Sequence, residues 1–290
     1  MTPDEIAAYR RALREAKPGI ETLAETRARL DRRIETHPLP EGCAVQTVEV
    51  AGVACERLAP ATARPGRTLL YLHGGGYQVG SPRSHRFLAA RLAHQAGAHA
   101  VVPDYRMAPE APFPGAVDDA FTVFRALTAA GERVVIGGDS AGAGLALATA
   151  LSARGAGVSQ PAGLLLISPW ADLAHQGDTY DKERDDTVTV AGLSAAARSY
   201  AGEADLRHPL ISPLYADLAG LAPMRIDVGS SEALLTDSVR LARRAGAADV
   251  DVALRIIPHL AHSFAAHFQL LAPVREALDE AGAWAGQRLG

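Results

Sequence analysis

The sequence predicts an α/β protein with an eight-stranded, mostly parallel sheet that is covered by helices on both faces. Short apolar runs alternate with helix-length segments through most of the 290 residues. The later runs, such as 164–168 and 224–228, are continuously apolar, which is typical of parallel strands buried on both faces. A chain of this length with 48% hydrophobic residues can bury a sizeable core, so we expect residues 1–290 to form a single domain.

The first 35 residues predict two helices that precede the sheet. Thr2 and Glu5 have the spacing of a capping box, with Pro3 at the first helical position. This helix should run to about Lys17, where a Pro-Gly pair ends it, and an amphipathic helix should follow to about Glu35. A sheet does not require these helices, so they form either a lid over a site or plain surface helices.

The remaining elements follow in chain order. Residues 44–50 and 53–58 alternate in polarity around Ala51-Gly52, which predicts a hairpin. Further strands are expected over 68–72, 99–103, 133–137, 164–168, 224–228 and 252–256, and helices over 116–130, 141–154, 234–246 and 271–287.

One interval between strands is too long for a simple crossover. About 55 residues separate the strands at 164–168 and 224–228, and residues 191–201 within them have a helical composition. Insertions at the carboxyl ends of parallel strands cover binding pockets. We therefore expect a cap formed by residues from about 1–35 and about 171–210.

Composition argues against several classes of partner. The net charge is −4, and basic charge is carried almost wholly by scattered arginines, which does not favour nucleic-acid binding. The chain has no run of 18 apolar residues and no signal-peptide pattern at its beginning, so we expect a cytoplasmic protein without membrane partners. Cys43 and Cys55 fall near the predicted hairpin; free buried thiols are favoured, although their spacing leaves a disulfide open.

The segment Gly138-Asp139-Ser140-Ala141-Gly142 has the pattern of a nucleophile elbow. An apolar strand precedes it and a helix of small residues follows, so the serine hydroxyl should point out of a sharp turn. The amide of Ala141 should be free, because this residue opens the helix and lies at its positive end. Ser140 is thus a candidate nucleophile, and Ala141 a candidate oxyanion donor.

This segment does not match either of two glycine-rich phosphate-binding loops, the dinucleotide-binding loop and the P-loop. A dinucleotide-binding GxGxxG motif that began at Gly142 would need its third glycine where Leu147 stands. No GK[ST] sequence follows either, which excludes a P-loop.

A second glycine-rich segment, His73-Gly74-Gly75-Gly76, directly follows the strand at 68–72. Consecutive glycines let several backbone N–H groups converge, as an oxyanion hole requires, and the HGGG form is associated with esterases. By itself the segment could be a tight turn without a ligand. Combined with the elbow downstream, it supports one hypothesis of acyl chemistry.

This hypothesis requires an acid and a histidine after the serine. His262 lies in a loop beyond the last predicted strand and is preferred over His259. Glu232 lies in the loop after the strand at 224–228, whereas Asp237 should lie within the following helix. Because a loop position lets a carboxylate reach the imidazole, Glu232 is favoured and Asp237 remains the alternative.

The chain resembles the hormone-sensitive-lipase-like α/β-hydrolases, particularly bacterial esterases of the GDSAG type. The resemblance extends over nearly the whole chain. It rests on the positions 73–77, 104–110, 113–114, 118, 138–142, 168–170, 212–214, 228–229, 232, 234, 258, 262 and 264. It implies an α/β-hydrolase fold, a helical cap and, in many members, a homodimer. Ala233 departs from the family pattern, because many members have an aspartate followed by proline where this chain has Glu232-Ala233.

The resemblance also implies site roles. Ser140 would be the nucleophile, His262 the base and Glu232 the acid, while Gly75, Gly76 and Ala141 would donate the oxyanion N–H groups. The expected reaction is hydrolysis of a small-molecule ester, with no metal and no cofactor required. Short acyl chains are favoured because the cap contains no extended apolar lid.

Three alternatives use the same residues and stay open at this point: lactone hydrolysis, amide hydrolysis, and acyl transfer or cyclisation. A protein of this fold that only binds a ligand is a further alternative, less favoured because serine, acid and histidine are all available.

Overall fold

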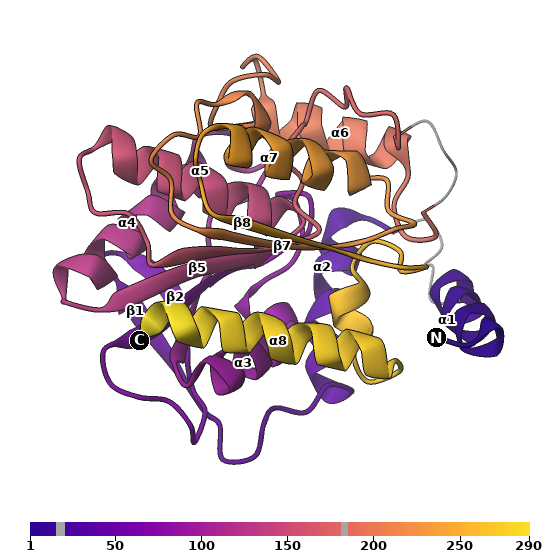
Figure 1. Ribbon diagram of the computed structural model, residues 1–290, viewed down its shortest axis with the longest axis horizontal. Helices are drawn as coiled ribbons and strands as arrows, with labels where there is room; N and C mark the ends of the chain where they lie inside the picture. Colours follow the sequence, from indigo (N-terminus) through magenta and orange to yellow (C-terminus); the bar gives the residue numbers. More distant parts are fainter. Residues whose placement is uncertain (16–20, 181–184) are drawn as a thin grey trace.

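A twisted eight-stranded sheet forms the centre of the protein (Figure 1). The computed structural model describes residues 1–15, 21–180 and 185–290. In sheet order the strands are β1 (Ala44–Val50), β2 (Val53–Ala59), β4 (His99–Pro103), β3 (Arg67–Leu72), β5 (Arg133–Asp139), β6 (Gly163–Ile167), β7 (Met224–Gly229) and β8 (Val252–Ile257). β2 runs antiparallel to both of its neighbours, and β3 to β8 are parallel. The predicted α/β class and mostly parallel sheet are confirmed.

Helices cover both faces of the sheet, as the continuous apolar strands predicted. α3 (Pro82–Ala96) and α8 (Ala272–Leu289) lie on one face, and α4 (Gly115–Ala129), α5 (Ala141–Gly155) and α7 (Leu235–Ala247) on the other (Figure 1). Alternate side chains of β3 enter different cores: Leu69 and Tyr71 pack toward α3 and α8, and Leu70 and Leu72 toward α4 and α5. This alternation fixes the register of the central strands.

Helix α3 was missed by the sequence analysis, which assigned no element between the strands at 68–72 and 99–103. Its beginning is nevertheless encoded locally: the Ser81 hydroxyl accepts a hydrogen bond from the Ser84 amide, and Pro82 occupies the first turn. Most of its side chains are buried between the sheet and α8. Its end is also marked locally, because Gly97 adopts the left-handed conformation with φ 61°. The missed helix was therefore recognisable from its two ends.

The N-terminal helices are α1 (Pro3–Glu15) and α2 (Leu23–Asp31), and a 3₁₀ turn, η1 (Arg32–Glu35), extends α2. The predicted capping box is confirmed, because the Thr2 and Glu5 backbone N–H groups donate to each other's side chains at 2.7 and 3.2 Å. The predicted end of the first helix near Lys17 lies outside the described residues. Tyr9 of α1 is buried, and Arg10 donates to the Ser231 hydroxyl at 3.1 Å, so α1 contacts the loop after β7.

The long insertion contains α6 (Val190–Ala201), close to the predicted helix at 191–201. Thr189 caps it by accepting a hydrogen bond from the Gly192 amide at 3.1 Å. The helix lies on the same side of the sheet as α5 and α7 (Figure 1).

Both cysteines are free thiols, as favoured above. Cys55 is buried, but Cys43 is only half-buried, so the prediction of two buried thiols was wrong for Cys43. Its position before β1, at the edge of the sheet, leaves one side uncovered.

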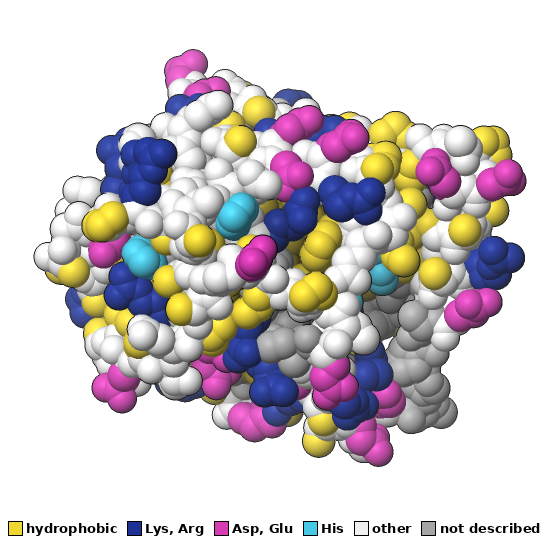
Figure 2. All heavy atoms as spheres, turned by 90° about the horizontal axis from the view of Figure 1, so that it is seen from below, with side chains coloured by type: hydrophobic (Ala, Val, Ile, Leu, Met, Phe, Trp, Pro, Cys, Tyr) yellow, Lys and Arg dark blue, Asp and Glu magenta, His cyan; other side chains and the backbone are white. Residues whose placement is uncertain are grey.

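The surface contains charges of both signs. On the face that Figure 2 shows, arginine and acidic side chains are interspersed rather than separated by sign. Among the described residues, no helix combines the length and the hydrophobicity needed to cross a bilayer.

Candidate active site

Ser140 occupies the sharp turn between β5 and α5, with φ 55° and ψ −122°. Its backbone is held on both sides: its amide donates to the Ile167 carbonyl at 2.9 Å, and its carbonyl accepts from the Trp170 amide at 3.0 Å. A Cβ atom at Gly142 would lie 2.0 Å from the Leu72 carbonyl oxygen. Glycine at this position lets α5 begin directly against the end of β3, which keeps Ser140 in its strained conformation.

Ser140, His262 and Glu232 are brought together by the fold. His262 Nε2 lies 2.8 Å from Ser140 Oγ, and its Nδ1 lies 3.0 Å from Glu232 Oε2. All three side chains are buried. Burial lowers the pKa of His262, but the hydrogen bond to Glu232 and the charge of that carboxylate outweigh burial, so the pKa is raised above 6.5.

The second oxygen of Glu232 is also fixed in place. Glu232 Oε1 accepts from the Ser168 hydroxyl at 2.7 Å and from the Gly229 amide at 2.6 Å. Ser168 belongs to the segment 168–170 that carries the family resemblance, but no role was predicted for it. The available signal was its position: it is a polar residue directly after the buried strand β6, beside the end of β5.

Asp139 connects the elbow to the glycine-rich loop. Its Oδ1 accepts from the Tyr71 hydroxyl at 2.7 Å and from the Gly74 amide at 3.1 Å, and its Oδ2 lies 3.6 Å from His85 Nε2. Burial raises the pKa of Asp139, but the charge of His85 and the hydrogen bonds outweigh burial and lower the pKa to about 2. Asp139 is therefore ionised at neutral pH, and the sequence analysis did not assign it a partner.

The glycine-rich loop after β3 brings backbone amides next to Ser140. Gly75 has φ +124° and Gly76 φ +61°, and a Cβ at Gly75 would lie 2.0 Å from the Val79 carbonyl oxygen. Ala141 follows Ser140 as the first residue of α5. Within the described part of the chain, the amides of Gly75, Gly76 and Ala141 have no hydrogen-bond acceptor. Three free N–H groups near the Ser140 hydroxyl can receive a negative oxygen.

The histidine and tyrosine behind this loop hold it in shape. His73 stacks on Tyr105 with a ring separation of 4.2 Å, and the Tyr105 hydroxyl donates to the His73 carbonyl at 2.7 Å. Burial, with the nearby His85, lowers the pKa of His73 to about 3, so His73 is a neutral structural residue.

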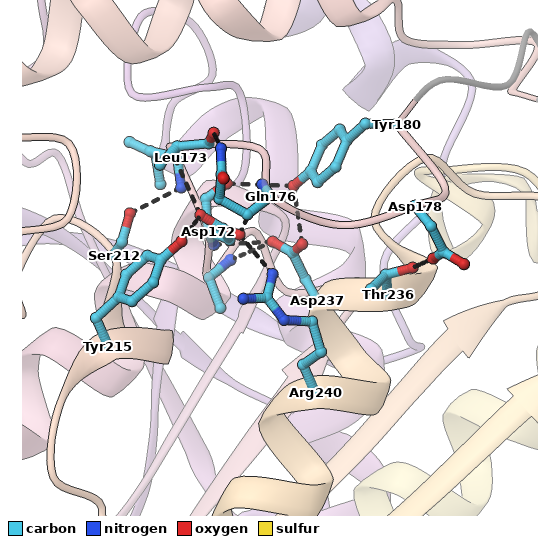
Figure 3. Close-up of polar contacts among 12 residues, drawn as sticks. Asp172, Leu173, Gln176, Asp178, Tyr180, Ser212, Tyr215, Thr236, Asp237 and Arg240 are labelled. Atoms are coloured by element: carbon cyan, nitrogen blue, oxygen red, sulfur yellow. Dashed lines mark hydrogen bonds and ion pairs between the residues drawn. The ribbon is translucent and has the colours of Figure 1, made fainter.

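Asp237, the alternative acid, belongs to a different cluster (Figure 3). It lies in the first turn of α7, as expected, and accepts from the Ala171 and Asp172 amides at 2.9 Å each and from the Tyr180 hydroxyl at 2.9 Å. Burial and the charge of Asp172 raise the pKa of Asp237 to about 8. None of its recorded contacts within the described residues is with His262, and it instead ties the insertion after β6 to α7.

His259, the alternative histidine, is also apart from Ser140. It is exposed, and its backbone amide donates to the Ser230 hydroxyl at 2.8 Å.

A cavity of about 570 Å³ opens beside Ser140 and His262. This volume is within the usual range for small-molecule sites. Leu30 of α2 and Phe87 of α3 border one part of the cavity. Val188, which precedes α6, and Leu193 in its first turns border another. Among the described residues, no group of three or more His, Cys, Asp or Glu side chains could hold a metal ion.

Comparison with known families identifies the fold. Residues 69–266 match the family model for the alpha/beta hydrolase fold. The chain belongs to this α/β-hydrolase family. That span includes the elbow, the glycine-rich loop, Glu232 and His262.

Related proteins within this family are named as hydrolases of acetyl groups and of ethyl acetate. An acetyl-hydrolase of Streptomyces hygroscopicus is 43% identical over 242 residues, which cover 82% of this chain and 81% of the relative. An ethyl acetate hydrolase of Pseudomonas putida is 35% identical over 211 residues, which cover 69% of this chain and 66% of that protein.

Solved structures extend the similarity over the full length. The crystal structure of an esterase from the bacterial hormone-sensitive lipase family superposes with a TM-score of 0.95 at 34% identity and covers 100% of both chains. A second, of EstE5 soaked with p-nitrophenyl butyrate, gives 0.93 at 36% identity and covers 100% of this chain and 99% of that one. The chain is thus a member of the hormone-sensitive-lipase-like branch.

The separate position of Asp237 generates a stability prediction. Asp237→Ala leaves two buried amides and the Tyr180 hydroxyl without their acceptor, so we expect the free energy of unfolding to fall by about 2–5 kcal/mol. Chemical denaturation measures this change. Val239→Ala, at an exposed position of the same helix, is the matched control and should change stability by less than about 0.5 kcal/mol. Equal stabilities for the two variants would refute the structural role of Asp237.

Proposed function

We propose that this protein hydrolyses short-chain carboxylic esters through a covalent acyl-enzyme on Ser140. The chain is an ester hydrolase by family, and its relatives include an acetyl-hydrolase and an ethyl acetate hydrolase. The observation that carries the mechanism is the continuous hydrogen-bonded line from Glu232 through His262 to Ser140. This order of acid, imidazole and hydroxyl is the arrangement that activates a serine.

In the proposed reaction, the Ser140 hydroxyl attacks the ester carbonyl carbon while His262 Nε2 takes its proton. The negative oxygen of the tetrahedral intermediate is received by the amides of Gly75, Gly76 and Ala141. His262 then donates the proton to the departing alcohol, which leaves an acyl group on Ser140. A water molecule repeats the attack and releases the acid, again with His262 as base and then acid.

Glu232 is proposed to hold the imidazole and to stabilise its charged form. Its two carboxylate oxygens have different partners. Oε2 contacts His262, and Oε1 accepts hydrogen bonds from Ser168 and Gly229. The glutamate is one methylene longer than an aspartate and reaches the ring from its loop position.

We further propose that about 1–35 and about 171–210 form a cap. The cavity supports this, because Thr26 and Leu30 from the first segment and Val188 and Leu193 from the second both border it. The proposed preference for short acyl chains rests instead on the relatives, which include an acetyl-hydrolase and an ethyl acetate hydrolase.

Removal of the proposed nucleophile tests the reaction. Across p-nitrophenyl esters from acetate to palmitate, we expect turnover that peaks at short chains and falls by roughly 10⁴-fold or more in Ser140→Ala. A serine-directed phosphonate should label the wild type but not this variant. Ser159→Ala, at an exposed loop serine, is the control and should retain turnover and labelling. Unchanged turnover in Ser140→Ala would disprove the mechanism.

The pH profile tests the role of Glu232. Activity requires neutral His262, so kcat/KM should rise with pH through the raised pKa of His262, above 6.5. Glu232→Gln removes the charge that stabilises the imidazolium; this rising limb should then move to lower pH, and kcat should fall by roughly 10³–10⁴-fold. Glu232→Asp keeps the charge and should keep the limb nearer its original position. A limb that does not move in Glu232→Gln would contradict this role.

We also propose that the protein forms a homodimer along β8. This strand lies at the edge of the sheet and exposes Leu254 and Ile256, at 36% and 43%. Light scattering should give twice the chain mass of 30.4 kDa, and Ile256→Asp should give the monomer. Leu270→Asp, at an exposed apolar residue outside the sheet, should leave the dimer intact. A monomeric wild type would refute this proposal.

A further inference from the structure

One charged side chain at the cavity has no counter-ion among the residues that the structure describes. Arg33, in the 3₁₀ turn η1 that follows α2, borders the same cavity as Ser140 and His262. Within residues 1–15, 21–180 and 185–290, its guanidinium has no recorded hydrogen bond and no acid within 4 Å. Burial lowers the pKa of Arg33, which reflects the cost of holding its charge away from water.

The neighbouring arginines of α2 are all satisfied by other groups. Arg27 pairs with Glu110 at 2.8 Å, and Arg29 pairs with Glu21 at 3.0 Å. Arg33 differs from these two residues: it borders the cavity and, among the described residues, has no acid like those that pair with Arg27 and Arg29. A half-buried charge without a partner is unfavourable, and such groups persist where they have a ligand to bind.

The acid of the cavity does not neutralise Arg33. Asp139 is the only acid among the described residues that line the cavity, and its contacts are with Tyr71, Gly74 and His85. The charge of Asp139 does act on Arg33 and favours its charged form, but no ion pair joins them within 4 Å. The positive charge at this wall therefore remains available to a ligand.

We propose that Arg33 is a specificity residue that binds a carboxylate carried by the ester substrate. A guanidinium presents two parallel N–H groups that match the two oxygens of a carboxylate. The preferred substrates would then be esters with a carboxylate at the end remote from the reacting carbonyl. This inference rests on the proposed esterase function and names the substrate class of the same site.

The carboxylate could belong to either half of the ester, and two substrate series separate these cases. The first contains monoethyl esters of succinate, adipate and suberate, in which the acyl half carries the charge. The second contains butyrate esters of hydroxyacids of matched lengths, in which the alcohol half carries the charge. Each compound is compared with its uncharged primary amide, which has nearly the same shape.

For the wild type, we expect the best carboxylate ester to exceed its amide counterpart in kcat/KM by roughly 10- to 100-fold. Arg33→Gln should reduce this ratio to about 1 or less, and Arg33→Lys, which keeps the charge but loses the planar fork, should retain part of it. Arg32→Gln removes an exposed arginine of the same turn and should keep the wild-type ratio. The series in which the ratio appears identifies the half of the ester that contacts Arg33.

A second measurement needs no variant, in case Arg33→Gln fails to fold. Adipate should inhibit wild-type hydrolysis of p-nitrophenyl butyrate competitively and more strongly than adipamide, by roughly 10-fold or more in inhibition constant. A wild type that hydrolyses neutral esters through Ser140 but does not distinguish carboxylates from amides would overturn the role of Arg33 and leave the esterase proposal standing. Absence of any Ser140-dependent ester turnover would overturn both.

Discussion

The close approach of two backbones at the ends of β3 and β5 is the constraint on which the site depends. Gly142, the second residue of α5, lies so near the Leu72 carbonyl that any side chain would collide with it. This contact, together with the hydrogen bonds of Ser140 to Ile167 and Trp170, holds the serine at a positive φ. The neighbouring strand β3 leads directly into the loop of Gly75 and Gly76. The Ser140 hydroxyl and the amides of this loop therefore lie together at the carboxyl ends of these two central strands.

Each of three buried acidic side chains in this region has its own hydrogen-bond donors. Asp139 joins the elbow to the glycine-rich loop, Glu232 is held by Ser168 and Gly229, and Asp237 fastens the insertion to α7. Because each of these acids accepts hydrogen bonds from fixed groups, its desolvation is partly offset and its geometry is rigid. Arg33 is the contrasting case: a cation at the cavity wall with no recorded acid partner in the described chain.

Much of the fold could be predicted because it is encoded in local patterns. Continuous apolar runs identified the parallel strands, and glycines at 138 and 142 identified the elbow. Helix α3 was missed, although Ser81-Pro82 marks its beginning and Gly97 its end. The preference for Glu232 over Asp237 came from an argument about loop position, and the structure adds the distances: 3.0 Å from Glu232 to His262, and a separate hydrogen-bond cluster around Asp237.

The sequence by itself determined where the strands lie along the chain, the sharp turn at Ser140 and which residues are candidates for catalysis. Each of these depends on neighbours within a few positions. Only the tertiary structure decided which of these residues meet. Glu232 and His262 are 30 positions apart, and His262 and Ser140 are 122 apart. Their contacts depend on how the strands are ordered in the sheet. The same is true of Arg33, which the local sequence marks only as one more arginine of a charged helix. The packing of its turn, η1, against α3 places it at the cavity.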